Sequence, residues 1–253
     1  MNIKILVATH KSYWIPSDSI YMPIQVGCAL NDLDLGFARD DTGDNISNKN
    51  KNYCELTALY WAWKNLDSDY IGLAHYRRHF TLRKGADKNS LPITSSDLEP
   101  LLNNYDVILP RKRNYYIETT YSQYVHAHHK EDLDITEEII KESYPDYLDS
   151  YKKAMDMTKS HRFNMFIMKK ELFDSYCEWL FGILFELEKR LDISQYSPYD
   201  ARVFGFVSER LLDVWILTNQ IKYKEIPYVF MEKQNWLKKG GAFLKRKFVH
   251  KSL

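Results

Sequence analysis

A short apolar run that ends in basic residues constrains the fold more than any other feature. Residues 70–80 read Tyr-Ile-Gly-Leu-Ala-His-Tyr-Arg-Arg-His-Phe. The apolar part predicts a buried strand over residues 70–75. Ligands of open α/β sheets bind in the crevice beyond the carboxyl ends of the strands, and arginine offers paired donors that match phosphate oxygens. The segment therefore suggests a nucleotide-diphosphate site, although an isolated arginine pair is more often solvated or bound to nearby carboxylates.

The rest of the pattern favours an α/β fold with a mostly parallel sheet. Residues 3–8 form an apolar run that enters a polar loop at Thr9, as a first strand does. A helix over residues 52–65 and the strand at 70–75 would complete a strand–helix–strand unit. Residues 24–30 predict a short helix or strand. Further strands are expected at 105–109 and 163–168, and helices within 114–160 (interrupted near Pro145), at 171–191 and at 199–219.

Composition limits the class of protein. With 253 residues, 45% of them apolar, the chain is long enough for one large domain. Lys and Arg number 35 against 34 Asp and Glu, a net charge of +1, which argues against a general nucleic-acid binder. Aromatic residues reach 15% and suit sugar stacking as well as packing. The three widely spaced cysteines predict neither a disulfide framework nor a zinc site. No signal peptide or membrane span is expected, so we expect a cytoplasmic location.

The densest polar loop is residues 39–45, Arg-Asp-Asp-Thr-Gly-Asp-Asn. The side chains of Asp40, Asp41, Asp44 and Asn45 could accept hydrogen bonds from ribose or uracil, or hold a metal ion. The loop lacks the spacing of an EF-hand. Taken alone, such a loop is more often a turn whose Asp and Asn side chains bond to their own backbone.

A second cluster comprises His126, His128, His129, Glu131 and Asp132. Histidines next to carboxylates invite a metal site, but the H-E-x-x-H spacing is missing. Neutral histidines also hydrogen-bond to sugar hydroxyls. We therefore favour a polar wall of a substrate site over a metal centre here.

A third cluster lies on the expected helix at 199–219 and includes Arg202, Glu209 and Arg210. Glu209 lies among apolar residues, and a carboxylate in such surroundings is a candidate general base. A structural Glu–Arg pair that fixes the helix against the sheet is an equal alternative. The chain contains no G-x-S-x-G, Walker or G-x-G-x-x-G motif, so hydrolase, P-loop and Rossmann dehydrogenase activities lack support.

Six segments, taken in order, resemble one family. They are residues 21–30, 39–47, 54–61, 75–78, 163–168 and 202–211. The chain resembles the bacterial capsular and exopolysaccharide glycosyltransferases long catalogued as a domain of unknown function, some of which are described as galactofuranosyltransferases. The match runs from about residue 3 to about residue 231. It implies a GT-A-like nucleotide-sugar-binding domain over residues 1–232, with a helical elaboration on the acceptor side.

The resemblance also implies roles for individual residues. Thr9, His10, Lys11 and the loop residues Asp40, Asp41, Asp44 and Asn45 would bind the nucleotide, and Asn164 and Arg202 would complete the donor site. His75, Arg77 and Arg78 stand where most GT-A enzymes carry a D-x-D motif that holds the diphosphate through a divalent cation. Two arginines could replace the charge of that cation, so we favour transfer without a metal ion, with Mn²⁺ or Mg²⁺ as the alternative.

The implied reaction is the transfer of galactofuranose from UDP-galactofuranose, with inversion, to a polyprenyl-diphosphate-linked acceptor of a capsular or exopolysaccharide repeat unit. Arg77 and Arg78 would stabilise the departing diphosphate. Glu209 or Asp132 would take the acceptor proton, and His128 and His129 would bind the acceptor. The rival is a non-catalytic carbohydrate- or nucleotide-binding module, which needs no base.

The C-terminal segment, residues 233–253, is basic, contains no acidic residue and interleaves aromatic side chains with lysines. Such a segment suits contact with an anionic membrane surface, here the inner face of the cell membrane. A disordered basic tail is the alternative.

Overall fold

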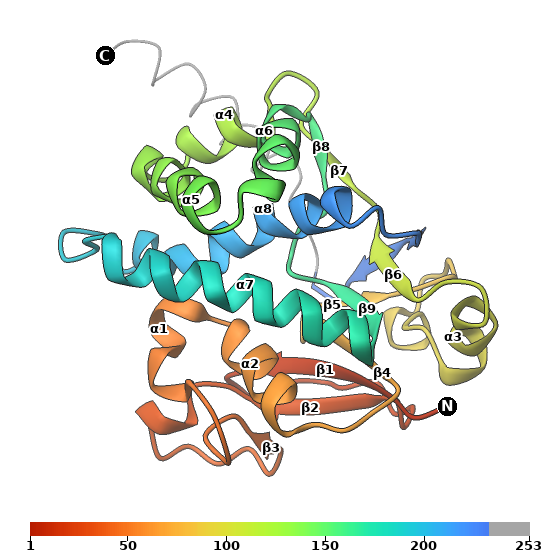
Figure 1. The fold of residues 1–253 in the computed structure, drawn as a ribbon. Coiled ribbons are helices and arrows are strands. Elements are labelled where there is room, and N and C mark those ends of the chain that lie inside the picture. The colour runs from red at the N-terminus through yellow and green to blue at the C-terminus, as the bar shows by residue number, and fades with distance from the viewer. Residues whose placement is uncertain (233–253) are drawn as a thin grey trace.

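The apolar runs of the sequence form the centre of one mixed sheet in the computed structural model, which describes residues 1–232 (Figure 1). Four parallel strands make one half, in the order β3-β2-β1-β4. They are β1 (Ile3–Thr9), β2 (Tyr21–Gln25), β3 (Ala38–Arg39) and β4 (Tyr70–His75). In β1 and β4 almost every side chain is buried, as parallel strands covered on both faces require.

The other half of the sheet makes it mixed. Strand β9 (Phe166–Lys169) runs antiparallel to both β4 and β6 (Val107–Pro110), and β6 is parallel to β10 (Tyr223–Ile226). Strand β5 (Arg78–Phe80) pairs with the end of β4 and with β11 (Tyr228–Phe230). Strands β7 (Arg113–Asn114) and β8 (Lys159–Ser160) form a separate pair. The expected α/β fold with a mostly parallel sheet is confirmed.

Helices cover both faces of the sheet. One face packs on α1 (Asn50–Tyr53), α2 (Leu56–Asn65), α7 (Lys170–Arg190) and α8 (Val203–Thr218). The opposite face packs on α3 (Ser95–Leu102). Helices α4 (Thr120–Val125), α5 (Lys130–Ser143) and α6 (Leu148–Asp156) form a further layer, in which α6 packs on α8 and α5 on α7 (Figure 1). Short 3₁₀ turns lie at Cys28–Leu30, Ser47–Lys49, Lys88–Ser90, Pro145–Tyr147 and Asp200–Arg202.

Two sequence predictions were wrong in detail, and both errors fall beside the site described below. The expected helix at 52–65 is broken at Cys54, whose φ of 54° is outside the helical range. The strand expected from residue 163 begins at Phe166, because Phe163 and Asn164 adopt left-handed conformations with φ of 77° and 52°. The strands expected at 3–8 and 70–75, the long helix α7 and the interruption at Pro145 were predicted correctly, and β1 extends one residue further, to Thr9.

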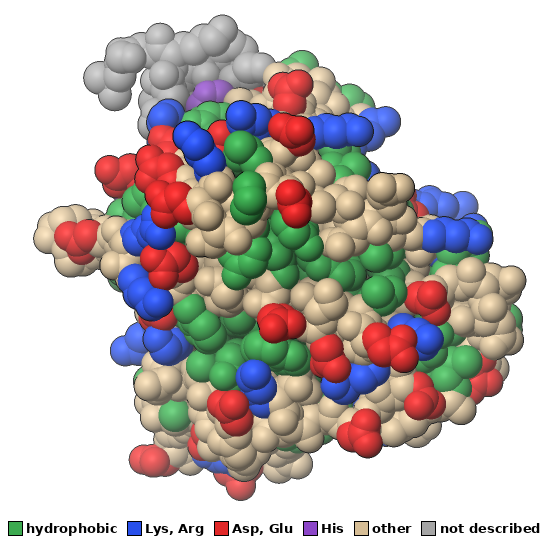
Figure 2. All heavy atoms as spheres, viewed as in Figure 1, with side chains coloured by type: hydrophobic (Ala, Val, Ile, Leu, Met, Phe, Trp, Pro, Cys, Tyr) green, Lys and Arg blue, Asp and Glu red, His purple; other side chains and the backbone are tan. Residues whose placement is uncertain are grey.

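Charges of both signs are interspersed over the face that Figure 1 presents, and hydrophobic side chains show between them (Figure 2). This mixture agrees with a net charge of +1. Within residues 1–232, none of the helices combines the length and the apolar character that crossing a membrane requires. The basic aromatic segment 233–253 lies outside the described residues.

Candidate active site

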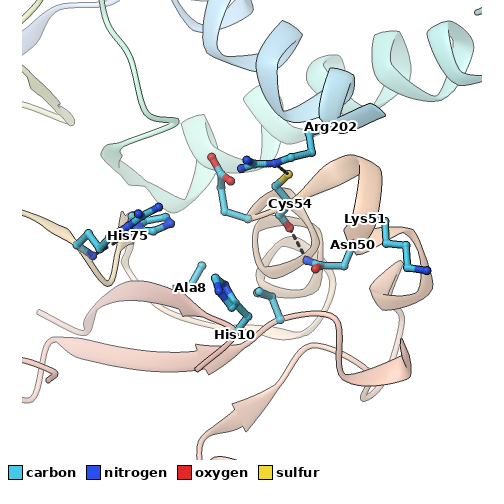
Figure 3. Close-up of a pocket in the computed structure, with 10 residues that line it drawn as sticks. Ala8, His10, Asn50, Lys51, Cys54, His75 and Arg202 are labelled. Atoms are coloured by element: carbon cyan, nitrogen blue, oxygen red, sulfur yellow. Dashed lines mark hydrogen bonds between the residues drawn. The ribbon is translucent and has the colours of Figure 1, made fainter. Parts of the chain in front are cut away.

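A cavity of about 280 Å³ opens at the carboxyl ends of β1 and β4, where the sequence predicts a ligand site (Figure 3). In Figure 3, Arg202 and His10 lie above and below this cavity, and His75 and Lys51 lie at its two sides. The strand ends, α1, the start of α2 and the turn before α8 all contribute. The lining residues are Ala8, His10, Val26, Asn50, Lys51, Cys54, Glu55, His75, Arg77 and Arg202.

The two histidines of the cavity are held neutral. Burial, followed by the charges of Arg78 and Arg77, lowers the pKa of His75 far below its ordinary value. Burial and then Lys11 lower the pKa of His10 in the same direction. The Arg77 backbone N–H donates to Nδ1 of His75 at 3.3 Å, which leaves Nε2 as the protonated nitrogen of the neutral ring. The fixed positive charge of the site therefore comes from its arginines and lysines.

Arg77 lines the cavity, whereas Arg78, the next residue, is not among the lining residues. Within the described chain the Nε atoms of both side chains are buried without a hydrogen-bond partner. Arg77 makes a long ion pair with Glu232 at 3.8 Å, and the Arg78 guanidinium stacks 4.2 Å above the ring of Phe163. Burial lowers the pKa of Arg78, while Glu209 and Glu55 oppose that shift. A buried guanidinium with unused donors is well suited to a phosphate group.

Glu55 is the carboxylate of the cavity, and sequence reasoning missed it. Its Oε1 accepts a hydrogen bond of 2.9 Å from Nδ2 of Asn164. Burial raises the pKa of Glu55, although the Asn164 bond and the charge of Arg202 counteract the shift. The one available signal was its position in the 54–61 segment that carries the family resemblance.

Two left-handed backbone segments meet at this carboxylate. Cys54 precedes Glu55 with a φ of 54°, and Asn164 follows Phe163, whose φ is 77°. Asn164 also accepts a bond from the Ser208 hydroxyl at 2.9 Å and donates to the Gly205 carbonyl at 3.2 Å. Positive φ is unfavourable for side chains such as Cys and Phe and is concentrated at functional sites. Together these contacts fix the orientation of Glu55 against α8.

Glu209 lies on α8, next to the cavity rather than among the residues that line it. Its side chain is 20% exposed and pairs with Arg210 at 3.1 Å. Its charge raises the pKa of Glu55 and of Arg78, so the carboxylate lies within electrostatic reach of both. Arg202 donates from Nε to the Cys54 sulfur at 3.1 Å, which ties the turn before α8 to the start of α2.

The loop containing Asp40, Asp41, Asp44 and Asn45 does not line the cavity. Asp40 is fully buried and accepts bonds from the backbone N–H groups of Gly27 and Cys28 and from the hydroxyls of Ser47 and Thr57. Asp41 pairs with Arg39 at 2.8 Å. Asp44 contacts α2, where the Tyr60 hydroxyl donates to its carboxylate and Asn65 donates to its carbonyl. Asn45 bonds locally, since it donates to the Gly43 carbonyl and accepts from the Ser47 N–H. The structure thus gives Asp40 a structural set of contacts in place of exposure to a nucleotide.

Thr9 and Lys11 flank His10 at the end of β1. The Thr9 hydroxyl is buried and donates to the Lys11 carbonyl at 2.6 Å. The Lys11 ammonium lies 5.2 Å from the ring centre of Tyr76. Thr9 therefore shapes the turn, while Lys11 adds positive charge near His10.

Asp132 lies in the first turn of α5, and His128 and His129 lie in the connection between α4 and α5. The hydroxyls of Tyr124 and Tyr196 both donate to Asp132 at 2.7 Å, and the residue is 1% exposed. His128 is paired with Asp200 at 3.4 Å, and His129 stacks on Tyr196 with centroids 4.0 Å apart. Asp200 and Arg202 share one turn, so this cluster adjoins the cavity.

The residues at the position of the D-x-D motif do not fit a hard divalent cation. Mg²⁺ and Mn²⁺ take oxygen ligands, whereas His75, Arg77 and Arg78 supply nitrogen donors and positive charge. Among residues 1–232 no group of three His, Cys, Asp or Glu side chains is placed to share an ion.

A mixed α/β sheet with a basic, carboxylate-containing cavity at its strand ends defines a glycosyltransferase-like protein, as comparison with solved structures shows. The fold superposes on the apo structure of the WbbM bifunctional glycosyltransferase with a TM-score of 0.85 and 31% sequence identity, over 92% of this chain. The family described as a domain of unknown function, DUF4422, matches residues 4–220. The chain belongs to that family.

The match to WbbM covers 46% of that protein, so this chain spans just under half of its length. A comparison with curated protein sequences finds no match.

Proposed function

We propose that this protein is a UDP-sugar-dependent glycosyltransferase with a GT-A-like donor site. The observation that carries the proposal is the cavity itself, in which neutral histidines, the two arginines Arg77 and Arg202 and one carboxylate converge at the carboxyl ends of β1 and β4. The 31% identity to a bifunctional glycosyltransferase supports the same class. A non-catalytic nucleotide- or carbohydrate-binding module is the alternative.

In the proposed reaction an acceptor hydroxyl attacks the anomeric carbon as the bond to the diphosphate breaks, which inverts the configuration. Arg77 and Arg78 donate to the departing diphosphate oxygens, where negative charge grows in the transition state. Their fixed charge replaces a divalent cation, so we propose metal-independent transfer. Lys11 and Arg202 add positive charge around the nucleotide, and neutral His10 offers a hydrogen-bonding ring beside them.

We propose Glu55 as the base that takes the acceptor proton, with Glu209 as the second candidate. Glu55 lines the cavity, and Asn164 orients it. Its raised pKa makes it a better proton acceptor than an exposed carboxylate. Asp132 has both oxygens occupied by tyrosine hydroxyls, so we assign it to holding the acceptor-side helices.

We further propose galactofuranose as the transferred sugar and a polyprenyl-diphosphate-linked oligosaccharide as the acceptor, in capsular or exopolysaccharide synthesis. His128 and His129 would contact the acceptor sugar. The basic segment 233–253 would hold the enzyme at the cytoplasmic face of the membrane. These points rest on the family resemblance, which describes some members as galactofuranosyltransferases.

Nucleotide binding is tested by thermal unfolding with UDP, UDP-galactofuranose, UDP-galactopyranose, GDP-mannose and CMP, each with EDTA and with manganese. We expect stabilisation by the UDP compounds that persists in EDTA and is lost in Arg77→Met, which removes an arginine that lines the cavity. The matched control is Arg83→Met, because Arg83 lies outside the cavity and pairs with Asp97. Stabilisation that requires manganese would refute the metal-independent reaction, and no response to any UDP compound would refute the proposed donor class.

Turnover separates an enzyme from a binding module. With UDP-galactofuranose and a lipid-linked acceptor, we expect Glu55→Gln to lower kcat by about 10²–10⁴-fold, the usual contribution of a general base, while UDP binding stays within twofold. Asp132→Asn serves as the comparison for a buried carboxylate outside the cavity. If the protein is a binding module, the wild type will show no sugar transfer. If Glu209→Gln lowers kcat more than Glu55→Gln does, Glu209 is the base.

The role of the C-terminal segment is tested by co-sedimentation with anionic vesicles. Replacing Lys238, Lys239, Lys245 and Lys247 by glutamine should release the protein from phosphatidylglycerol vesicles but leave UDP binding unchanged. Undiminished co-sedimentation of this variant would show that the segment is not the membrane contact.

A further inference from the structure

Arg162 is a buried cation that has no ion-pair partner among residues 1–232. It is 2% exposed, and none of its three guanidinium nitrogens finds a hydrogen-bond partner in the described part of the chain. Its one favourable contact is with the ring of Tyr115, 5.2 Å from the guanidinium carbon. A buried charge is strongly destabilising unless it is paired and hydrogen-bonded, and a single cation–π contact compensates only in part.

The neighbouring charges are already paired with one another. Arg210 donates to Glu209, to the Phe206 carbonyl and to Gln123, and only its Nε is left without a partner. His161 lies between Asp213 at 2.6 Å and Glu225 at 3.2 Å, and Lys112 pairs with Asp213 at 3.5 Å. In this cluster the carboxylates of Asp213 and Glu225 balance the basic side chains of His161 and Lys112. Arg162 is therefore the surplus positive charge of the region.

The position of Arg162 relates it to the proposed reaction. It directly precedes Phe163, which stacks on Arg78, and Asn164, which holds Glu55. Burial lowers the pKa of both Arg162 and Arg78, and the charge of Glu209 opposes that shift at each, so this carboxylate lies within electrostatic reach of both arginines. Arg162 is not among the residues that line the donor cavity. An exposed cation, Arg113, contacts the same Tyr115 ring with its guanidinium carbon 4.9 Å from the centre.

We propose that Arg162, with the unused Nε of Arg210, forms a second oxyanion site that binds a phosphate or diphosphate group of the acceptor. Arg113 would attract that group from the solvent, and Tyr115 would flank it. The inference rests on the proposed glycosyltransferase function, because only then do two phosphate-bearing substrates need separate sites. The proposed site also specifies the acceptor. Its diphosphate must lie near the reacting hydroxyl, so only a few sugars separate the diphosphate from that hydroxyl.

The test measures inorganic pyrophosphate binding to the full-length protein, by calorimetry, with and without saturating UDP. We expect UDP-saturated wild type to bind pyrophosphate and Arg162→Met to weaken that binding at least tenfold, with UDP affinity unchanged within twofold. Arg162→Lys should be intermediate, since it keeps the charge but loses the planar fork of donors. The control Lys159→Met removes an equal charge at an exposed position of β8 and should bind pyrophosphate like the wild type.

Three results would overturn the proposal. The first is that the UDP-saturated protein binds no pyrophosphate, and the second is that Lys159→Met weakens pyrophosphate binding as much as Arg162→Met. The third is that Arg162→Met loses as much affinity for UDP as for pyrophosphate. The last would assign Arg162 to the donor. Stability gives an independent readout, because removing an uncompensated buried charge should leave the melting temperature of the ligand-free protein unchanged or higher, whereas loss of a structural arginine lowers it. If UDP itself fails to bind, the donor proposal fails, and the pyrophosphate comparison on UDP-free protein still decides the role of Arg162.

Discussion

Replacing Asp40 by asparagine tests whether the polar loop 39–45 serves the fold or the nucleotide. The sequence makes Asp40 a candidate donor-binding residue, but in the structure its carboxylate is buried and surrounded by donors. One oxygen accepts from the Gly27 N–H at 2.8 Å, and the other accepts from the Cys28 N–H at 3.1 Å. The hydroxyl of Thr57 adds a bond of 2.6 Å to the first oxygen, and Ser47 bonds to the second.

The geometry sets the size of the effect. Asparagine has one acceptor oxygen, so its NH₂ group must face one of the two backbone N–H groups in either orientation. A hydroxyl can rotate away, and Thr57 already has the Cys54 carbonyl within 3.2 Å, but a backbone N–H cannot. The substitution therefore loses one hydrogen bond to a charged group and leaves one buried N–H unsatisfied. Together these amount to about 3–5 kcal/mol of unfolding free energy, on the order of 10 °C in melting temperature for a chain of this length.

Urea denaturation followed by circular dichroism gives the change in unfolding free energy, and calorimetry gives the UDP affinity at a temperature where both proteins are folded. Asp41→Asn is the matched control in the same loop, because its partly exposed pair with Arg39 should contribute less than about 1 kcal/mol. A structural Asp40 predicts a large loss of stability with UDP affinity unchanged. A loss of stability below 1 kcal/mol, together with weakened UDP binding, would refute the reasoning and return Asp40 to the nucleotide site.

Three further outcomes follow from buried groups. Asp213 and then Glu225 raise the pKa of His161 against the effect of burial, so the stability that its charge contributes is complete below about pH 6.5 and is lost as pH rises through the folded pKa. His161→Gln should therefore flatten the fall of the urea midpoint between pH 6 and pH 9, and an unchanged pH profile would contradict this. Burial raises the pKa of the Cys54 thiol to about 11, so iodoacetamide at pH 8 should modify Cys54 far more slowly than a free thiol. Bound UDP should slow the modification further. Rapid labelling, measured by mass spectrometry, would contradict the protection of the thiol by burial. Gly72→Ala in β4 would place a Cβ 2.9 Å from the Phe166 carbonyl oxygen and should cost about 1–3 kcal/mol of stability in urea, whereas a neutral result would mean that β9 can shift.

The sheet was predictable because its strands are continuous apolar runs with polar ends. Residues 3–9 and 70–75 must be buried on both faces, and no other element of that length satisfies the pattern. The antiparallel direction of β9 was not predictable, because a four-residue apolar strand looks the same in either direction. Pairing partners depend on where α7 and the helices before it pack, which local sequence does not encode.

The cavity residues His10, His75, Arg77 and Arg202 were predictable for the same reason, since they lie at or just beyond strand ends or just before a helix, and they do line the cavity. Glu55 was not. A glutamate inside an expected helix is most simply a solvated residue, and only the left-handed Cys54 ends α1 early enough to turn Glu55 inward. The buried contacts of Asp40 were not predictable either, because its four donors come from three separate segments.

The arrangement of Cys54, Glu55, Phe163 and Asn164 explains why two predictions failed at the same place. Each left-handed turn is unfavourable by itself, yet each brings one partner of the Glu55–Asn164 bond to the other, and α8 holds the pair through Ser208. Phe163 meanwhile lies beneath Arg78. A single irregular junction thus orients the proposed base and one proposed phosphate-binding arginine together. Because the backbone before β9 sets both, a change there should affect donor binding and proton transfer jointly, while a change in the side chain of Glu55 should affect proton transfer alone.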